Sequence, residues 1–230
     1  MLIYAHRGAS KAEPENTLRA FRRALDAGVH GIELDLHATA DGIPVVIHDA
    51  DVSRTTNGTG KVASLQYAEL ATLDAGRGER IPTLAEVLSL AGDRLHFDLE
   101  IKQPGIEREV LTVLARFPSA RWAISSFDWD ILRAVRSLAP AADVWVLTMA
   151  LSDDVFAVAH EIGATAVSLC APAFTSDAAE SLARAGLRAV VWTVNDPAVA
   201  KEMARRGAYG LCTDVPEVML AALAPMTGHE

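Results

Sequence analysis

The sequence predicts a (β/α)8 barrel, and three observations support this fold class. Short apolar runs rich in β-branched residues alternate with amphipathic helical patterns along most of the 230 residues. Such alternation is typical of parallel strands joined by right-handed helical crossovers. From Trp122 onward, five strand-like runs begin about 19–23 residues apart. Nine strand-like runs are present in all, and one of them is better explained as an appendage, so that eight remain to close a barrel.

The predicted elements follow one another in a regular order. The strand-like runs cover residues 2–8, 31–40, 43–49, 95–102, 122–127, 144–149, 166–171, 189–194 and 209–214. Helical patterns separate most of them, as in residues 15–28, which end at Gly28, and in residues 128–138 and 197–207. A doubly wound open sheet is the alternative, but no GxGxxG motif follows the first strand.

A hairpin accounts for the ninth strand. Only Asp41 and Gly42, a strong turn signal, separate residues 31–40 from residues 43–49, so these two strands should be antiparallel. We therefore expect a single domain over residues 1–230, with an insertion over about 39–80. If Asp41 and Gly42 are the central turn residues, the numbers of paired residues add up to 83, which places Asp35 opposite His48.

Composition limits the possible partners and location. The net charge of −9 disfavours a nucleic-acid partner, because such proteins draw affinity from a basic surface. No apolar run approaches the ~20 residues that span a bilayer, so stable membrane insertion is not expected. The start of the chain lacks the features of a secretory signal, and the two cysteines suit free thiols, which together favour a cytoplasmic protein. Nothing indicates an oligomeric state, and residues 226–230 are typical of a frayed tail.

Polar residues gather where the predicted strands end, and catalytic groups of such barrels lie at that face. The first strand ends on His6 and Arg7. Glu33 and Asp35 are two residues apart and share one face of the second strand. Other strands contribute polar residues, namely His96, Asp98, Glu100, Lys102, Asn195, Thr213 and Asp214, together with the aromatic Trp192.

This set of side chains suits phosphodiester cleavage. The carboxylates of Glu33, Asp35 and Glu100 would bind a hard divalent cation, Mg²⁺ or Ca²⁺, through oxygen ligands. Arg7 and Lys102 are good phosphate ligands. His6 and His48 are candidates for general acid–base catalysis, because imidazole as a side-chain type changes charge near neutral pH. The same residues could instead form ion pairs only, Glu33 and Asp35 with Arg7 and Lys102, or Glu100 with Lys102.

Nearly the whole chain resembles the short, soluble bacterial members of the glycerophosphodiester phosphodiesterase family. The resemblance rests on nine fragments in the family's order: AHRG, PENT, ELDLHATADGIPVVIHD, RTTNGTGKV, IPTLAEVL, LEIK, SSF, VVWTVN and CTDVP. It implies a TIM-like barrel with one divalent metal ion at Glu33, Asp35 and Glu100. It also implies catalytic roles for His6 and His48, and phosphate contacts from Arg7 and Lys102.

The substrate class implied by the resemblance is glycerophosphodiesters, hydrolysed to sn-glycerol 3-phosphate and an alcohol such as choline or ethanolamine. Phe127 and Trp192 match positions that line the family's pocket. A phospholipase D-like hydrolysis of lysophospholipids is the alternative, and an isomerase, an aldolase or a non-catalytic binding protein is less well supported. Glu15 and Asn16 are candidates for supporting roles, although Asn16 could equally be the N-cap of the first helix. The segment RTTNGTG could be an ordinary loop.

Overall fold

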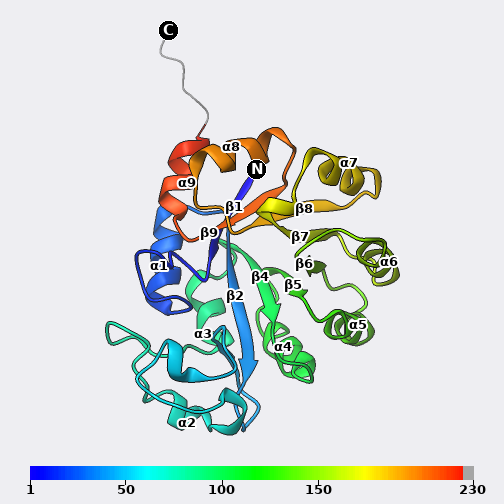
Figure 1. Ribbon diagram of the computed structural model, residues 1–230. Helices are drawn as coiled ribbons and strands as arrows, with labels where there is room; N and C mark the ends of the chain where they lie inside the picture. Colours follow the sequence, from blue (N-terminus) through cyan, green and yellow to red (C-terminus); the bar gives the residue numbers. More distant parts are fainter. Residues whose placement is uncertain (225–230) are drawn as a thin grey trace.

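The computed structural model describes residues 1–224 and contains a closed eight-stranded parallel barrel (Figure 1). The barrel strands are β1 (Leu2–His6), β2 (Gly31–Ala38), β4 (His96–Ile101), β5 (Arg121–Ser126), β6 (Val144–Thr148), β7 (Ala166–Cys170), β8 (Arg188–Trp192) and β9 (Gly210–Thr213). They run in the order β1-β9-β8-β7-β6-β5-β4-β2, and the pairing of β1 with β2 closes the ring. The predicted (β/α)8 fold class is confirmed.

Helices surround the barrel (Figure 1). They are α1 (Leu18–Ala27), α3 (Leu84–Ala91), α4 (Glu107–Leu114), α5 (Trp129–Leu138), α6 (Asp153–Glu161), α7 (Ser176–Arg184), α8 (Pro197–Arg205) and α9 (Pro216–Leu223). Outward-facing strand residues such as Ile32, Leu34 and Leu99 belong to the main apolar core and are fully buried. Each such side chain stabilises the fold by roughly 1.5–3 kcal/mol.

The alternation along β2 and β4 directs the remaining side chains into the barrel. Because neighbouring residues of a strand face opposite sides, burying Leu34 against the helices turns Glu33 and Asp35 inward. The parallel register pairs Glu33 with Asp98 and Asp35 with Glu100, so four carboxylates lie on adjacent strands. A buried charge is costly unless it is paired, so this register already points to a functional site.

The segment between β2 and α3 forms a separate small unit beside the barrel (Figure 1, lower left). It contains β3 (Pro44–Val46), the short 3-10 helices η1 (Val52–Arg54) and η2 (Val62–Ser64), and α2 (Tyr67–Leu70). Its own apolar cluster comprises Val45, Ile47, Val52, Val62, Leu70, Ala75 and Ile81. The predicted antiparallel appendage is therefore present as β3.

The predicted register of the hairpin is wrong by one residue. Leu36 pairs with Val46 and Ala38 with Pro44, so the numbers of paired residues add up to 82. The residue opposite Asp35 is therefore Ile47, not His48, and the Ile47 N–H donates to the Asp35 carbonyl. The Thr39 N–H donates to the Ile43 carbonyl at 3.1 Å, which leaves a three-residue loop. A two-residue type I′ turn needs positive φ at both central residues, but only Gly42, with φ 76°, has it.

The helices of the described residues 1–224 are all too short or too polar to cross a bilayer. The predicted tail over residues 226–230 lies outside the described residues. The N-cap of α1 is Thr17, whose side chain accepts from the Ala20 N–H, so Asn16 does not cap this helix. Asn16 is consequently available for another role.

Candidate active site

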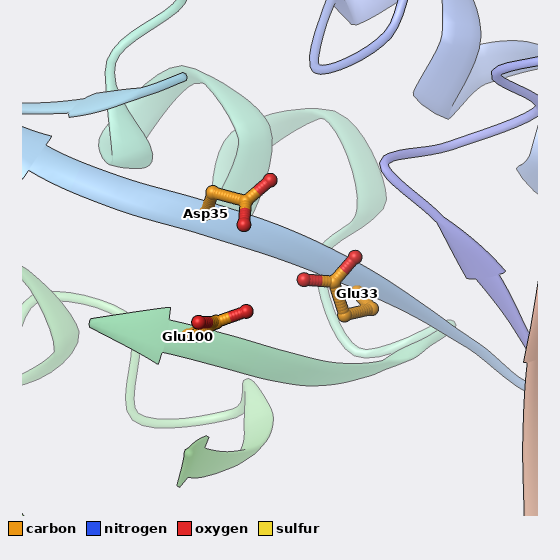
Figure 2. Close-up of side chains that lie close together, drawn as sticks. All are labelled: Glu33, Asp35 and Glu100. Atoms are coloured by element: carbon orange, nitrogen blue, oxygen red, sulfur yellow. The ribbon is translucent and has the colours of Figure 1, made fainter. Parts of the chain in front are cut away.

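Three carboxylates converge inside one end of the barrel. Glu33 and Asp35 project from β2 and Glu100 from β4, and the three side chains point toward one another (Figure 2). One carboxylate oxygen from each lies within 4.8 Å of the other two. All three residues are buried. These are the residues that the sequence suggested as metal ligands, and the structure brings them together.

The electrostatics of this cluster favour a cation. Burial, and then the charges of Asp35 and Glu100, raise the pKa of Glu33 well above its usual range. Burial and the charge of Asp35 likewise raise the pKa of Glu100. Asp35 Oδ1 is buried without a hydrogen-bond partner among residues 1–224. A buried carboxylate oxygen without a hydrogen bond, and acids that repel one another, are what a bound divalent cation would relieve, so the residues fit such an ion.

Arg7 and Lys102 flank the carboxylates. Arg7 Nε lies 3.1 Å from Asp35 Oδ2, and Lys102 Nζ lies 2.7 Å from Glu100 Oε1 and 3.6 Å from Asp35 Oδ1. Burial alone would lower the pKa of Lys102, but attraction to Glu100 and Asp35 outweighs it and raises the pKa. Of the ion pairs considered from the sequence, those of Asp35 and Glu100 are present, whereas among residues 1–224 Glu33 forms none with Arg7 or Lys102. The pairs that are present keep both cations charged at the cavity.

His6 is held by a carboxylate behind it. Its Nδ1 lies 2.7 Å from Asp214 Oδ1, and Asp214 also accepts from Asn195 Nδ2 at 2.6 Å. Burial would raise the pKa of Asp214, but the hydrogen bonds from His6 and Asn195 outweigh it and lower the pKa, so this carboxylate stays ionised. An ionised carboxylate only accepts, so Nδ1 carries a proton, and in the neutral ring Nε2, 3.9 Å from Glu33 Oε2, is the acceptor.

His48 has the same arrangement although it comes from the insertion. Its Nδ1 lies 2.5 Å from Asp49 Oδ1, and its Nε2 lies 3.2 Å from Lys102 Nζ. An ammonium group has no acceptor, so Nε2 must accept and Nδ1–H must donate to Asp49. His37, next to the hairpin, contacts the His48 carbonyl through its Nε2 at 3.1 Å and fixes the backbone there.

One cavity of about 150 Å³ connects these groups. It is lined by His6, Arg7, Glu33, His48, Asp98, Glu100, Lys102, Ser125, Phe127, Leu147, Ser168, Trp192, Thr193 and Cys212. The rings of Phe127 and Trp192 form part of the wall and meet edge to face with centroids 5.5 Å apart. Nine of the eleven site residues suggested by the sequence therefore line the cavity or belong to the carboxylate cluster beside it.

Comparison with known proteins assigns the chain to a family. The family model for the glycerophosphoryl diester phosphodiesterase family matches residues 6–218. A glycerophosphodiester phosphodiesterase of Caldanaerobacter subterraneus is 37% identical over 95% of this chain and 96% of its own length. The chain belongs to the glycerophosphoryl diester phosphodiesterase family.

Solved structures agree with this assignment. An Oleispira antarctica phosphodiesterase in complex with the product sn-glycerol 3-phosphate superposes with a TM-score of 0.93 at 28% identity, over 98% of this chain and 97% of the other. A glycerophosphodiester phosphodiesterase from Agrobacterium tumefaciens gives a TM-score of 0.86 at 28% identity, over 96% and 99% of the two chains. The protein is accordingly an enzyme, a phosphoric diester hydrolase that acts on glycerophosphodiesters.

Within this phosphodiesterase, Glu15 and Asn16 stand behind the cavity. Asn16 Nδ2 donates to Asp35 Oδ2 at 2.8 Å and so orients that carboxylate. Glu15 Oε1 accepts from Arg7 Nη1 at 3.1 Å. Both residues occupy the loop between β1 and α1, and each contacts a residue of the carboxylate and cation set.

Three further residues of the phosphodiesterase site received no role from the sequence, although Asp98 and Asp214 were noted there among the polar residues of the strands. Asp214 and Asp49 back the two histidines, and Asp98 lines the cavity. Each residue had one feature in the sequence that pointed to the site. Asp214 lies at the end of a strand, Asp49 directly follows His48, and Asp98 is on the same face of its strand as Glu100. Burial raises the pKa of Asp98 to about 7, and its Oδ1 accepts from Ser125 Oγ at 2.6 Å.

Proposed function

We propose that this chain hydrolyses small glycerophosphodiesters, such as glycerophosphocholine or glycerophosphoethanolamine, to sn-glycerol 3-phosphate and the alcohol. The proposal includes one divalent metal ion and two histidines acting as general acid and general base. One observation carries the proposal. The two histidines, the side chains of Arg7 and Lys102, and carboxylates of the acidic cluster all line one cavity. The product complex of the Oleispira relative supports the choice of substrate class.

Glu33, Asp35 and Glu100 would hold the ion, Mg²⁺ or Ca²⁺. Such an ion, when bound, would act as a Lewis acid that offsets negative charge on the phosphoryl oxygens. Two observations support this assignment: Asp35 Oδ1 accepts no hydrogen bond within residues 1–224, and the pKa values of Glu33 and Glu100 are raised. An all-oxygen ligand set suits a hard cation rather than zinc.

Arg7 and Lys102 would bind the phosphate. Arg7 offers a planar fork of N–H donors and Lys102 a point charge, and each is positioned by carboxylates of the site. Phe127 and Trp192 would pack against the carbon skeleton of the substrate on the wall they form. Together they would fix the phosphorus atom between the two histidines.

His6 and His48 would move the protons. With Nδ1–H directed at a carboxylate, each ring presents Nε2 to receive or return a proton. One ring would deprotonate the nucleophile, and the other, in its protonated form, would protonate the departing alkoxide. Water would give glycerol 3-phosphate directly, whereas the glycerol 2-hydroxyl would first give a cyclic phosphate that water then opens. Either ring could serve as the base.

Release of glycerol 3-phosphate from glycerophosphocholine, with Mg²⁺, with Ca²⁺ and with EDTA, tests the proposal. His48→Ala should lower turnover by at least about 10²-fold, the usual contribution of a general acid or base. His160→Ala, which changes an exposed histidine on α6, is the control. No release with either ion, or equal rates for the two variants, would overturn the proposal.

The lysophospholipid alternative has one observation in its favour. Phe127, which lines the cavity, and Met149 directly follow the adjacent strands β5 and β6 at the same end of the barrel, and they are 44% and 61% exposed. Large exposed apolar side chains at a substrate entrance could receive an acyl chain. Met149→Ser should then slow hydrolysis of lysophosphatidylcholine but not of glycerophosphocholine; an equal effect on both would remove this alternative.

The predicted partners and location are part of the same proposal. A small water-soluble diester is the proposed ligand of the cavity, and the net charge of −9 supports the absence of a nucleic-acid partner. The cytoplasmic location stays a prediction. Cell fractionation followed by immunoblotting would test it.

A further inference from the structure

The RTTNG part of the RTTNGTG segment forms a defined turn rather than an irregular loop. It begins with the last residue of η1, a helix whose N-cap Asp51 accepts from the Ser53 N–H at 2.9 Å. Thr56 Oγ1 donates to the Val52 carbonyl at 2.8 Å, and the backbone and side chain of Asn57 exchange hydrogen bonds with Asp74. These contacts fix the backbone that presents Arg54, the last residue of η1.

The Arg54 guanidinium binds two carboxylates at once. Its Nε and Nη2 donate to the two oxygens of Asp49 at 2.5 and 3.2 Å. Its Nη1 and Nη2 donate to the two oxygens of Glu15 at 3.0 and 2.8 Å. Two bidentate pairs on one guanidinium use the planar fork fully, which a lysine could not do.

Each of these carboxylates has a second partner inside the active site. Asp49 accepts from His48 Nδ1 at 2.5 Å, and Glu15 accepts from Arg7 Nη1 at 3.1 Å. Arg54 therefore stands behind both a proposed proton-transfer residue and a proposed phosphate ligand. Hydrogen bonding to Arg54 is the largest cause of the lowered pKa of Asp49, and it keeps this carboxylate ionised for His48.

The origin of His48 explains why such a link is needed. His48 lies between β3 and η1, on the insertion with its own apolar cluster, whereas Arg7 follows barrel strand β1. The contact of Arg54 with Glu15 crosses from the insertion to the β1–α1 loop. Without it, the partly exposed side chains of Asp49 and Glu15 would each keep only the one hydrogen bond that they make to His48 and Arg7.

We propose that Arg54 is a positioning residue that clamps Asp49 and Glu15 and thereby orients His48 and Arg7 together. This inference rests on the proposed function for the roles of His48 and Arg7. Arg54 does not line the cavity, so it acts through its two carboxylate partners rather than on substrate.

Steady-state kinetics with glycerophosphocholine, in the divalent ion that supports wild-type turnover, test the clamp. Arg54→Ala should lower kcat and raise KM, with a combined loss in kcat/KM of at least about 10-fold, as is usual for partners of functional side chains. Arg54→Lys should recover only part of the loss. Asp49→Asn should act mainly on kcat and Glu15→Gln mainly on KM, and both should cost less when Arg54 is already alanine.

The matched control is Arg133→Ala. Arg133 is a similarly exposed arginine that bridges two carboxylates, Asp130 and Glu161, and neither of them lines the cavity. Arg133→Ala loses an equivalent set of ion pairs and should keep wild-type kinetics. Kinetics of Arg54→Ala within twofold of this control, or strictly additive double variants, would overturn the proposal.

Nitrogen-15 spectra of the imidazoles separate this inference from the proposed function. At a pH where His48 is neutral, the wild type should show a downfield, slowly exchanging Nδ1–H signal from the hydrogen bond to Asp49, and in Arg54→Ala this signal should move upfield or be lost to exchange with water. This result without any turnover of the wild type would refute the proposed substrate and leave the clamp standing. An unchanged Nδ1–H signal in Arg54→Ala, beside an active wild type, would refute the clamp alone.

Discussion

Replacing Asp98 by asparagine should change how the stability of the protein depends on pH. Asp98 is 1% exposed inside the barrel, and its Oδ1 accepts the Ser125 hydroxyl at 2.6 Å. Burial, outweighing this hydrogen bond, raises its pKa from 3.8 to about 7. Asparagine has the same shape but never ionises, so the substitution removes this ionisation from the folded state.

The sign and size follow from proton linkage. Between pH 3.8 and about 7, unfolded Asp98 has lost its proton while folded Asp98 retains it, so raising the pH destabilises the wild-type fold. A shift of about three pH units at ~1.4 kcal/mol per unit gives on the order of 4 kcal/mol, fully expressed above pH 7. Glu33 and Glu100 shift in the same direction but are present in both proteins, so their contributions largely cancel in the difference.

Urea unfolding of wild type and Asp98→Asn at several pH values from 4 to 8, in EDTA, measures this difference. The free energy of unfolding of Asp98→Asn relative to wild type should rise by a few kcal/mol across this range. Asp26→Asn, at an exposed position on α1, should show little such trend. If the free energy of unfolding of Asp98→Asn relative to wild type does not change with pH, or falls as the pH rises, that result refutes the claim that burial raises the pKa of Asp98.

Two other predictions concern the β1 loop and the histidines. Gly8→Ala should cost at least about 2 kcal/mol in thermal or urea unfolding, since φ is 81° and a Cβ atom would lie 2.7 Å from the Ala20 backbone; a wild-type stability would contradict it. A nitrophenyl ester of glycerol phosphate, whose leaving group needs little protonation, should restore much of the activity of either His6→Ala or His48→Ala, but not of both. Equal losses on both substrates would argue against a single acid and a single base.

The barrel could be predicted from the sequence because its signals are local. Along β2 and β4, apolar and polar residues alternate strictly, so Leu34 facing the helices fixes Glu33 and Asp35 inside. The register of the hairpin was predicted wrongly because the pair Asp41-Gly42 is compatible with both a two-residue turn and a three-residue loop. Only the backbone shows that Gly42 alone has positive φ.

Several of the residues that orient the groups at the cavity are far from them in the sequence. His6 meets Asp214 across 208 positions, and Arg54 meets Glu15 across 39, so no spacing in the sequence relates them. Asn16 could be read as a helix cap until the structure placed Thr17 in that role. The groups at the cavity could thus be named from strand ends, whereas the groups that orient them required the closed fold.

The central claim is that the carboxylate cluster binds one divalent ion. Anomalous diffraction from a crystal soaked in Mn²⁺ tests it most directly. We predict a single strong peak with one oxygen ligand each from Glu33, Asp35 and Glu100. A map without that peak, with Lys102 still paired to Glu100, would contradict the account.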